Sequence, residues 1–453
     1  MIGRTTRIVA LALAVLPALA CPSPGKGKTA YVGATLFDGT GAPVIRNAVI
    51  LVSGGRIEAA GQADMIKVPR GAAVVDLAGR WIIPGLIDMH VHIERWALRP
   101  YLAYGVTAVR DLGGVQDSVL FLRDDVHNGT AVGPRLFVSG AMIDGAPATF
   151  PGATAVRTAN DARRAVGNRV LIGASQIKVY TKIDRRLLEP LLDEAKALET
   201  PVAAHLGRVD AITAARLGVR TLEHMSGVVA SSVRDPARFF RAHDDFFTGW
   251  NLEERSWAGV DSAALDRTAR ALVQAGAALV PTLALHEAWG HLEDSSYVAG
   301  LDLTALPPAV REAWNIPDLV RRARTTTRDY PAFQNSRPNQ NLFVRLFYRA
   351  GGQVLAGSDS PNQLLPPGAS LHRELRLLVG AGLSPKDALL AATREPARLL
   401  GAADTLGVVQ PGAVADFVVL TADPLADIAN LALIQMVVAY GIAYDPRELR
   451  GAR

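Results

Sequence analysis

The 453-residue sequence contains a single cysteine, Cys21, so no internal disulfide can form and stability must come from a packed core. Lysine and arginine are scattered, with no dense basic run and no basic patch interleaved with aromatic residues. The net charge of +5 is therefore typical of a mildly basic surface, and no nucleic-acid partner is expected. Internal repeats and low-complexity tracts are also absent from the sequence.

The first apolar run, residues 8–16, is too short to span a bilayer, because a spanning helix needs about 20 residues. It follows Arg4 and Arg7 and precedes the small-residue sequence Ala18-Leu19-Ala20. This pattern predicts a signal peptide over residues 1–20.

The residue after this segment is Cys21, as in bacterial lipoproteins, whose cysteine carries a lipid anchor. The match is imperfect because Ala18 stands where a leucine is usual, and secretion with a free N-terminal cysteine is the alternative. Either reading predicts an exported bacterial protein, periplasmic or anchored to a membrane as a lipoprotein. Residues 21–29 are then expected to form a flexible tether.

The rest of the chain shows two kinds of pattern. Residues 31–75 are typical of short strands, including a hairpin of 48–52 with 56–59. From Leu86 onward, short apolar runs alternate with helical stretches, as in parallel βα units. Eight strands are predicted, at residues 86–92, 106–110, 135–139, 176–180, 202–205, 221–224, 278–281 and 353–357. Helices are predicted at residues 117–126, 185–199, 209–217, 261–275, 341–349, 371–380 and 385–400.

Eight such units predict an α/β fold with a (β/α)8 TIM barrel, in which catalytic groups lie at the carboxyl ends of the strands. Strand patterns return after the barrel, at residues 407–409, 415–420 and 433–440. Both termini are therefore expected to build one small β-sandwich domain, from residues 30–83 and 402–453, around a barrel of residues 84–401.

Two long connections, residues 228–261 and 282–340, contain four of the six tryptophans. Loops of this length are often functional, and aromatic content argues against disorder. They are expected to be ordered caps over the barrel mouth, with simple packing of inserted helices as the alternative.

The first barrel strand closes on two histidines, in Ile83-Pro84-Gly85-Leu86-Ile87-Asp88-Met89-His90-Val91-His92. Side chains alternate along a strand, so His90 and His92 point the same way and could hold one metal ion. A chance surface pair would explain an isolated motif of this kind. However, His205 and His224 also end predicted strands and Asp359 follows the eighth, so five metal-capable side chains are expected at one barrel face.

Lys178 lies in the strand Gln176-Ile177-Lys178-Val179-Tyr180. A cationic lysine would repel a metal ion, whereas a carbamate formed with CO₂ is an anionic ligand that can bridge two ions. A lysine paired with an acidic side chain inside the barrel is the alternative.

Together these pieces resemble the metal-dependent amidohydrolase superfamily, in the branch of imidazolonepropionase-like enzymes and prolidase-like Xaa-dipeptidases. The similarity covers nearly everything after Tyr31, and departs from the usual pattern where Met225-Ser226-Gly227 follows Glu223-His224. The matching pieces are the His90–His92 motif, Thr107-Ala108-Val109-Arg110-Asp111-Leu112-Gly113-Gly114, Ile177-Lys178-Val179-Tyr180, Ala204-His205, Glu223-His224, Ala356-Gly357-Ser358-Asp359 and Gly412-Ala413-Val414-Ala415-Asp416-Phe417.

The resemblance implies two divalent metal ions, expected to be zinc, although cobalt and manganese also suit such ligands. It implies His90 and His92 on one ion, His205 and His224 on the other, and carboxylated Lys178 between them. Asp359 would be both a ligand and the catalytic proton shuttle.

The implied reaction is hydrolysis of an amide or peptide C–N bond by a metal-bridging hydroxide, with a dipeptide or N-acyl amino acid as substrate. Arg110, Tyr180 and His286 are candidate substrate contacts, although Arg110 could instead form a salt bridge with an acidic residue. Hydrolysis of a cyclic amide or a lactone is the alternative activity. A third hypothesis is that the protein is a binding lipoprotein without catalytic activity. The sequence does not decide whether the protein forms a homo-oligomer.

Overall fold

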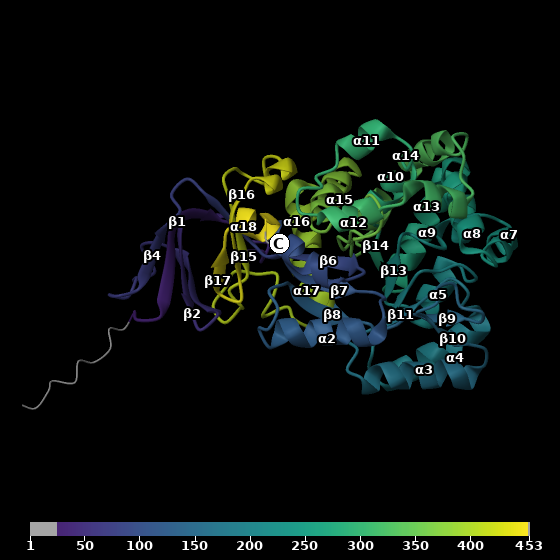
Figure 1. Ribbon diagram of the computed structural model, residues 1–453, viewed down its shortest axis with the longest axis horizontal. Coiled ribbons are helices and arrows are strands. Elements are labelled where there is room, and N and C mark those ends of the chain that lie inside the picture. Colours follow the sequence, from purple (N-terminus) through teal and green to yellow (C-terminus); the bar gives the residue numbers. More distant parts are fainter. Residues whose placement is uncertain (1–24, 452–453) are drawn as a thin grey trace, which may run out of the picture.

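The computed structural model describes residues 25–451 (Figure 1). The predicted signal peptide and Cys21 lie outside the described residues. Within residues 25–451, no helix combines the length and apolar character needed to cross a membrane. Lys28 and Thr29, which were expected to belong to the tether, lie in the first strand, where they pair with Ser53 and Val52.

The two ends of the chain share one eight-stranded sheet, in which purple and yellow strands lie together in Figure 1. The order is β17-β16-β15-β5-β1-β2-β3, with β4 paired to β1, and β15 pairs antiparallel with β5. Its two-layered form as a sandwich and the domain boundaries stay predictions. The strands are β1 (Lys28–Leu36), β2 (Ile45–Ser53), β3 (Arg56–Gln62), β4 (Ala73–Asp76), β5 (Trp81–Pro84), β15 (Phe417–Leu420), β16 (Ile434–Ala439) and β17 (Ile442–Tyr444). Residues 407–409, predicted as a strand, are irregular.

The middle of the chain forms two parallel sheets, which confirms the α/β class. One has the order β6-β7-β8 and the other β10-β9-β11-β12-β13-β14. Seven of the eight predicted strands are present, each within one residue of the expected ends. They are β6 (Leu86–Val91), β7 (Val106–Asp111), β8 (Arg135–Val138), β11 (Ile177–Val179), β12 (Val202–Ala204), β13 (Thr221–Glu223) and β14 (Ala278–Val280); β9 (Ile143–Gly145) and β10 (Thr154–Val156) were not predicted.

The eighth predicted strand, residues 353–357, forms one isolated bridge, and a second follows it at Ser360. Val354 bridges Leu279 on β14, and Ser360 bridges Val91 on β6. Met89 N also donates to Ala356 O (2.9 Å). This segment therefore lies between β14 and β6, while closure of the strands into one barrel stays a prediction.

Most of the helices between these strands follow predicted stretches, whereas those at Leu98–Ala103 and Ala159–Leu171 were not predicted; several begin at aspartate caps. Asp184, Asp210 and Asp261 each accept a hydrogen bond from the first turn of their helix. The helix predicted at 385–400 is interrupted and forms two. The helices are α1 (Leu98–Ala103), α2 (Gln116–His127), α3 (Ala159–Leu171), α4 (Arg185–Ala197), α5 (Ala211–Leu217), α9 (Ser262–Gln274), α14 (Tyr330–Arg349), α15 (Ala369–Gly380), α16 (Pro385–Ala391), α17 (Arg394–Leu399) and α18 (Pro446–Gly451), with short 3₁₀ helices η1 (Arg95–Ala97), η2 (Trp257–Gly259) and η3 (Ile428–Ala432).

The two long connections are helical and have an apolar core of their own. Trp250, Trp289, Tyr330 and Phe333 are buried together in this cluster, with Leu364 from the segment after Asp359. The connections thus form an ordered layer, at the upper right of Figure 1. Its helices are α6 (Val228–Ser232), α7 (Ala237–Ala242), α8 (Phe246–Ser256), α10 (Leu283–Trp289), α11 (Ser295–Ala299), α12 (Pro308–Ala313) and α13 (Ile316–Ala323).

One glycine decides how closely the irregular eighth segment approaches β6. A Cβ atom on Gly357 would lie 2.6 Å from Val280 Cγ1 and 3.0 Å from His90 Cβ. Gly357→Ala is therefore expected to lower the free energy of unfolding by about 1–3 kcal/mol, because the surrounding strands must shift. Urea titration would measure it.

Gly167→Ala is the control, because Gly167 lies inside α3 with open space around its Cα atom. It should raise the free energy of unfolding by up to about 1 kcal/mol through helix propensity. A Gly357→Ala protein as stable as the wild type would contradict the close approach.

Candidate metal centre

The six predicted metal ligands line one cavity of about 340 Å³. They come from β6, β11, the residues directly after β6, β12 and β13, and the segment after Val354. The carboxyl ends of these parallel strands therefore bring together side chains that are far apart in sequence. The ligands in question are His90, His92, Lys178, His205, His224 and Asp359.

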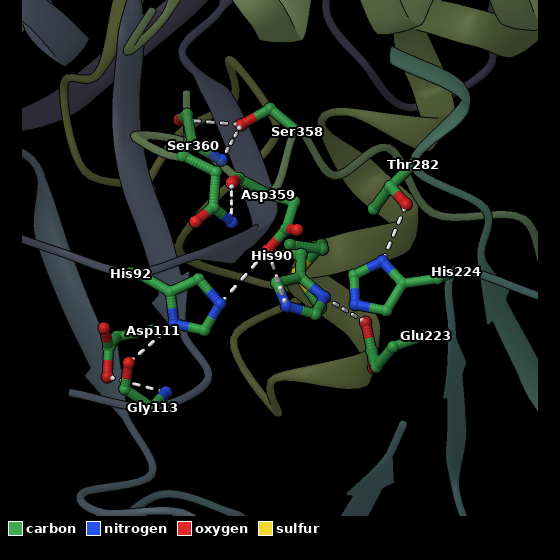
Figure 2. Close-up of polar contacts among 12 residues, drawn as sticks. His90, His92, Asp111, Gly113, Glu223, His224, Thr282, Ser358, Asp359 and Ser360 are labelled. Atoms are coloured by element: carbon green, nitrogen blue, oxygen red, sulfur yellow. Dashed lines mark hydrogen bonds and ion pairs between the residues drawn. The ribbon is translucent and has the colours of Figure 1, made fainter. Parts of the chain in front are cut away.

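His90, His92 and Asp359 form the closest group (Figure 2). Asp359 Oδ1 lies 3.3 Å from His90 Nε2 and 3.1 Å from His92 Nε2. The Nδ1 atoms are held from behind, since His90 Nδ1 donates to Glu223 (2.8 Å) and His92 Nδ1 donates to the carbonyl of Gly113 (2.6 Å). Both Nε2 atoms therefore present lone pairs to the same space as the carboxylate.

His224 and His205 extend this group. His224 has a ligand atom within 4.8 Å of those of His90 and Asp359, and its Nδ1 lies 2.8 Å from Thr282 Oγ1. The ring of His205 lies 4.7 Å from that of His224. His205 Nε2 is buried with no hydrogen-bond partner among the described residues, as is Lys178 Nζ. Buried polar atoms without partners are rare, so these indicate a ligand that supplies the missing interactions.

The electrostatics of the site favour neutral imidazoles. Burial lowers the pKa values of His90, His205 and His224 well below their ordinary value, because a buried imidazolium loses its hydration. Burial also lowers the pKa of His92, but interactions with Asp359, Asp111 and the carbonyl of Gly113 together raise it above its ordinary value. Three of the four histidines are thus held in the form that binds metals.

Lys178 is a buried amine among charged groups. Burial lowers the pKa of its amine to about 8, against the opposite effects of Glu223 and Asp359. No hydrogen-bonded carboxylate partner appears for it within residues 25–451, so the lysine–acid pair considered from the sequence is not what the described structure contains.

Glu223 is a functional candidate that the sequence motif does not single out from its neighbour His224. Its buried carboxylate accepts hydrogen bonds from His90 Nδ1 (2.8 Å), Arg110 Nη2 (2.8 Å) and Thr221 Oγ1 (2.6 Å). The sequence feature that could have identified Glu223 is a charged residue at the end of a short buried strand, β13. Glu223 fixes the orientation of His90 and compensates the charge of Arg110.

Arg110 and His286 do not line the cavity, in contrast to their predicted role as substrate contacts. Arg110 forms the salt bridge considered as its alternative, with Glu223, and lines a different cavity of about 210 Å³. His286 is buried behind the site, where Nε2 donates to His224 O (3.0 Å) and Nδ1 lies 2.7 Å from Glu254 Oε1. Both residues therefore support ligand-bearing segments from outside the cavity.

Tyr180, the third predicted contact, lines the cavity beside an aromatic surface. Its ring lies 4.8 Å from that of His205 and 5.9 Å from the stacked ring of Phe246. Phe246 and Trp250 belong to α8, one of the helices in the long connections. These connections therefore contribute directly to the wall of the cavity.

The pattern of the Amidohydrolase family matches residues 81–443, which is most of the chain. The chain belongs to the amidohydrolase family. Imidazolonepropionase of Pseudomonas putida is 26% identical over 407 residues, covering 85% of this chain and 90% of that protein. A solved structure from Bifidobacterium longum, assigned as a prolidase, has a TM-score of 0.68 and 26% identity over 93% of this chain and 95% of that one. The resemblance drawn from the motifs is confirmed.

A further relative matches this chain over a shorter length. The 5-methylthioadenosine/S-adenosylhomocysteine deaminase of Symbiobacterium thermophilum is 32% identical over 148 residues. The matched region covers 31% of this chain and 33% of the deaminase, so this chain matches about a third of the length of that relative.

Glu223→Gln tests the support of His90. The change keeps the shape but removes the charge, so metal affinity should fall about 10- to 100-fold, the usual cost of losing such a partner. It also leaves Arg110 buried and unpaired, which should lower the free energy of unfolding by about 3–5 kcal/mol. Metal titration of folded protein and urea titration would measure the two effects.

The double variant Glu223→Gln/Arg110→Met separates these effects. Removing both charges should restore much of the stability while metal affinity stays low. Full metal affinity in the double variant would show that Glu223 acts only as the counter-charge of Arg110.

Proposed function

We propose that this chain is a metal-dependent hydrolase of C–N bonds, acting on a dipeptide or N-acyl amino acid. The observation that carries the proposal is the convergence of His90, His92, His205, His224, Lys178 and Asp359 on one cavity. Family membership and the likeness to an imidazolonepropionase and a prolidase-assigned structure support a hydrolase of this class.

The residues fit a pair of divalent ions, for which we propose zinc. His90, His92 and Asp359 would hold one ion, and His205 with His224 the other. Lys178 would lie between them as a carbamate, since the neutral amine is the form that reacts with CO₂, and burial lowers the pKa of this amine. When bound, such ions lower the pKa of water and polarise a substrate carbonyl.

Asp359 is the proposed proton shuttle. Its Oδ1 is buried, faces the ligand histidines, and lacks a well-aligned hydrogen-bond donor among the described residues. Asn362 Nδ2 donates to its carbonyl oxygen (2.9 Å), and Asp359 N donates to His90 O (2.8 Å), so the backbone is held while the carboxylate can exchange a proton. An amine leaves poorly unless it is protonated, and Asp359 would deliver that proton.

We propose that β6, β7, β8, β11–β14 and residues 353–357 close into a (β/α)8 barrel. We also propose that the mature chain is exported, with Cys21 as a candidate lipid anchor. Cyclic-amide or lactone hydrolysis is the alternative activity; loss of catalysis is disfavoured because every ligand position is filled.

Metal content tests the two-ion centre. Purified protein should contain about two equivalents of zinc by elemental analysis, and Lys178→Ala should lose at least one, because the carbamate would bridge both ions. Lys182→Ala is the matched control, since the Lys182 amine bonds outside the site to Pro147 O. One equivalent in both the wild type and Lys178→Ala would rule out the bridging role.

Asp359→Asn tests the proton shuttle. Activity on an amide substrate should fall about 10²- to 10⁴-fold in kcat, the range for general acid–base groups, in protein shown by elemental analysis to retain its metal. Asp404→Asn, at an exposed aspartate, should leave kcat unchanged. A metal-loaded Asp359→Asn protein with full activity would remove Asp359 from this role.

A further inference from the structure

The cavity has a polar end and a long apolar wall, and the wall is aromatic. Six rings line it, with Phe246 against the ligand His205 (5.8 Å between centroids) and Phe247 against Phe246 (5.1 Å). Phe247 in turn stacks on Trp289 (6.1 Å, 9° between planes). The rings are those of Phe150, Tyr180, Phe246, Phe247, Trp250 and Trp289. A continuous apolar surface therefore runs from the metal-ligand group into the inserted helices.

This wall is held rigidly by its own core. Trp289 and Trp250 are each at most 7% exposed and belong to the apolar cluster of the inserted helices. Leu319 of α13 and Leu292 extend the same surface. A preformed apolar wall favours a large aromatic or aliphatic group on the ligand, because such a group removes the most apolar surface from water.

Apart from the six proposed metal ligands, one permanently charged side chain lines the cavity. Of the charged side chains among the described lining residues, Lys178 and Asp359 belong to the ligand group, which leaves Arg322 on α13. The Arg322 side chain is 52% exposed, whereas His90, His205 and His224 are at most 4% exposed. Arg322 therefore lies toward solvent, while the ligands lie at the floor.

The guanidinium of Arg322 has hydrogen-bond donors available for a ligand. Within residues 25–451 its guanidinium donates one hydrogen bond, from Nε to Asp318 Oδ2 (2.8 Å). Asp318 also pairs with Arg321, so one carboxylate serves two guanidinium groups and the local charge stays positive. A planar guanidinium with free donors suits a carboxylate.

We propose that Arg322 binds the free carboxylate of the substrate while the aromatic wall accepts its large apolar group. The substrate class is then an N-acylated amino acid, dipeptides included, that carries both an anion and an aromatic or large aliphatic group. This inference rests on the proposed hydrolysis of an amide. Arg322 thus takes the carboxylate-binding role that was predicted for Arg110, because Arg110 is paired with Glu223.

Three amides test the two elements separately in the metal-loaded enzyme: N-acetyl-L-phenylalanine, its neutral carboxamide, and N-acetylglycine. The first should have a kcat/KM at least about 10-fold above each of the others, since charge-assisted hydrogen bonds and ring burial each contribute that much. Arg322→Met should lower kcat/KM for the acid to near that of the carboxamide, mainly through KM, and leave the carboxamide unchanged. Added salt should weaken the preference, because Arg322 is half exposed.

Arg321→Met is the matched control, because Arg321 pairs with the same aspartate but does not line the cavity. It should leave the preference for the acid intact. Phe247→Leu should lower the ratio of kcat/KM for the phenylalanine substrate to kcat/KM for the glycine substrate. The Phe247 ring packs on Phe246 and Trp289, and among the described residues it makes no ring contact with a proposed ligand histidine. Equal effects of Arg322→Met on acid and carboxamide, or equal turnover of the phenylalanine and glycine substrates, would overturn the inference.

Binding separates failure of this inference from failure of the proposed reaction. Calorimetric titration of N-acetyl-L-phenylalanine into metal-loaded Asp359→Asn protein should give a Kd that rises about 10-fold with Arg322→Met added. Binding that depends on Arg322, without turnover of any of the three amides by the wild type, would overturn the hydrolase proposal and keep the binding site. Turnover with binding that ignores Arg322 would overturn the binding site alone.

Discussion

The buried carboxylate of Glu223 joins the interior of the parallel strands to the candidate metal centre. It accepts hydrogen bonds from Arg110, Thr221 and His90, and all four side chains are buried. Two charges in a low-dielectric interior are tolerated only when their bonds are complete, so each group constrains the positions of the others. The direction in which His90 presents Nε2 therefore depends on a salt bridge formed deeper in the strands.

The residues around the cavity also adopt backbone conformations that oppose stability. His224, Met225, Thr282 and Asp359 all have positive φ angles, between 47° and 60°, which cost non-glycine residues about 1–2 kcal/mol each. Local bonds offset this cost: Thr282 faces His224 Nδ1, Asp359 N donates to His90 O, and His286 donates to His224 O. Such strain persists only where the surroundings determine the conformation, and it tends to cluster at functional sites.

The sequence predicts best the features that depend on local pattern. Apolar runs located seven of the parallel strands, and the polar carboxyl ends of these strands identified the metal-capable residues that line the cavity. It could not show that residues 353–357 lack a regular ladder, because that depends on partners in β14 and β6. Nor could it show that Arg110, within a strand, would meet Glu223 from another strand. The extra length of α14 was hidden by Pro338, which the helix nevertheless includes.

The two parts of the cavity have separate origins. Strand ends supply the metal-capable groups, while the inserted helices, with their own core, supply the aromatic wall, so the wall can vary without rebuilding the ligand set. Trp250 is the exception. Its ring stacks on His286 (5.3 Å), which holds the carbonyl of His224, and lies 5.7 Å from the ring of His205. A group that packs against Trp250 would thus contact a ring that touches His205 and, through His286, the backbone of His224, two of the proposed metal ligands.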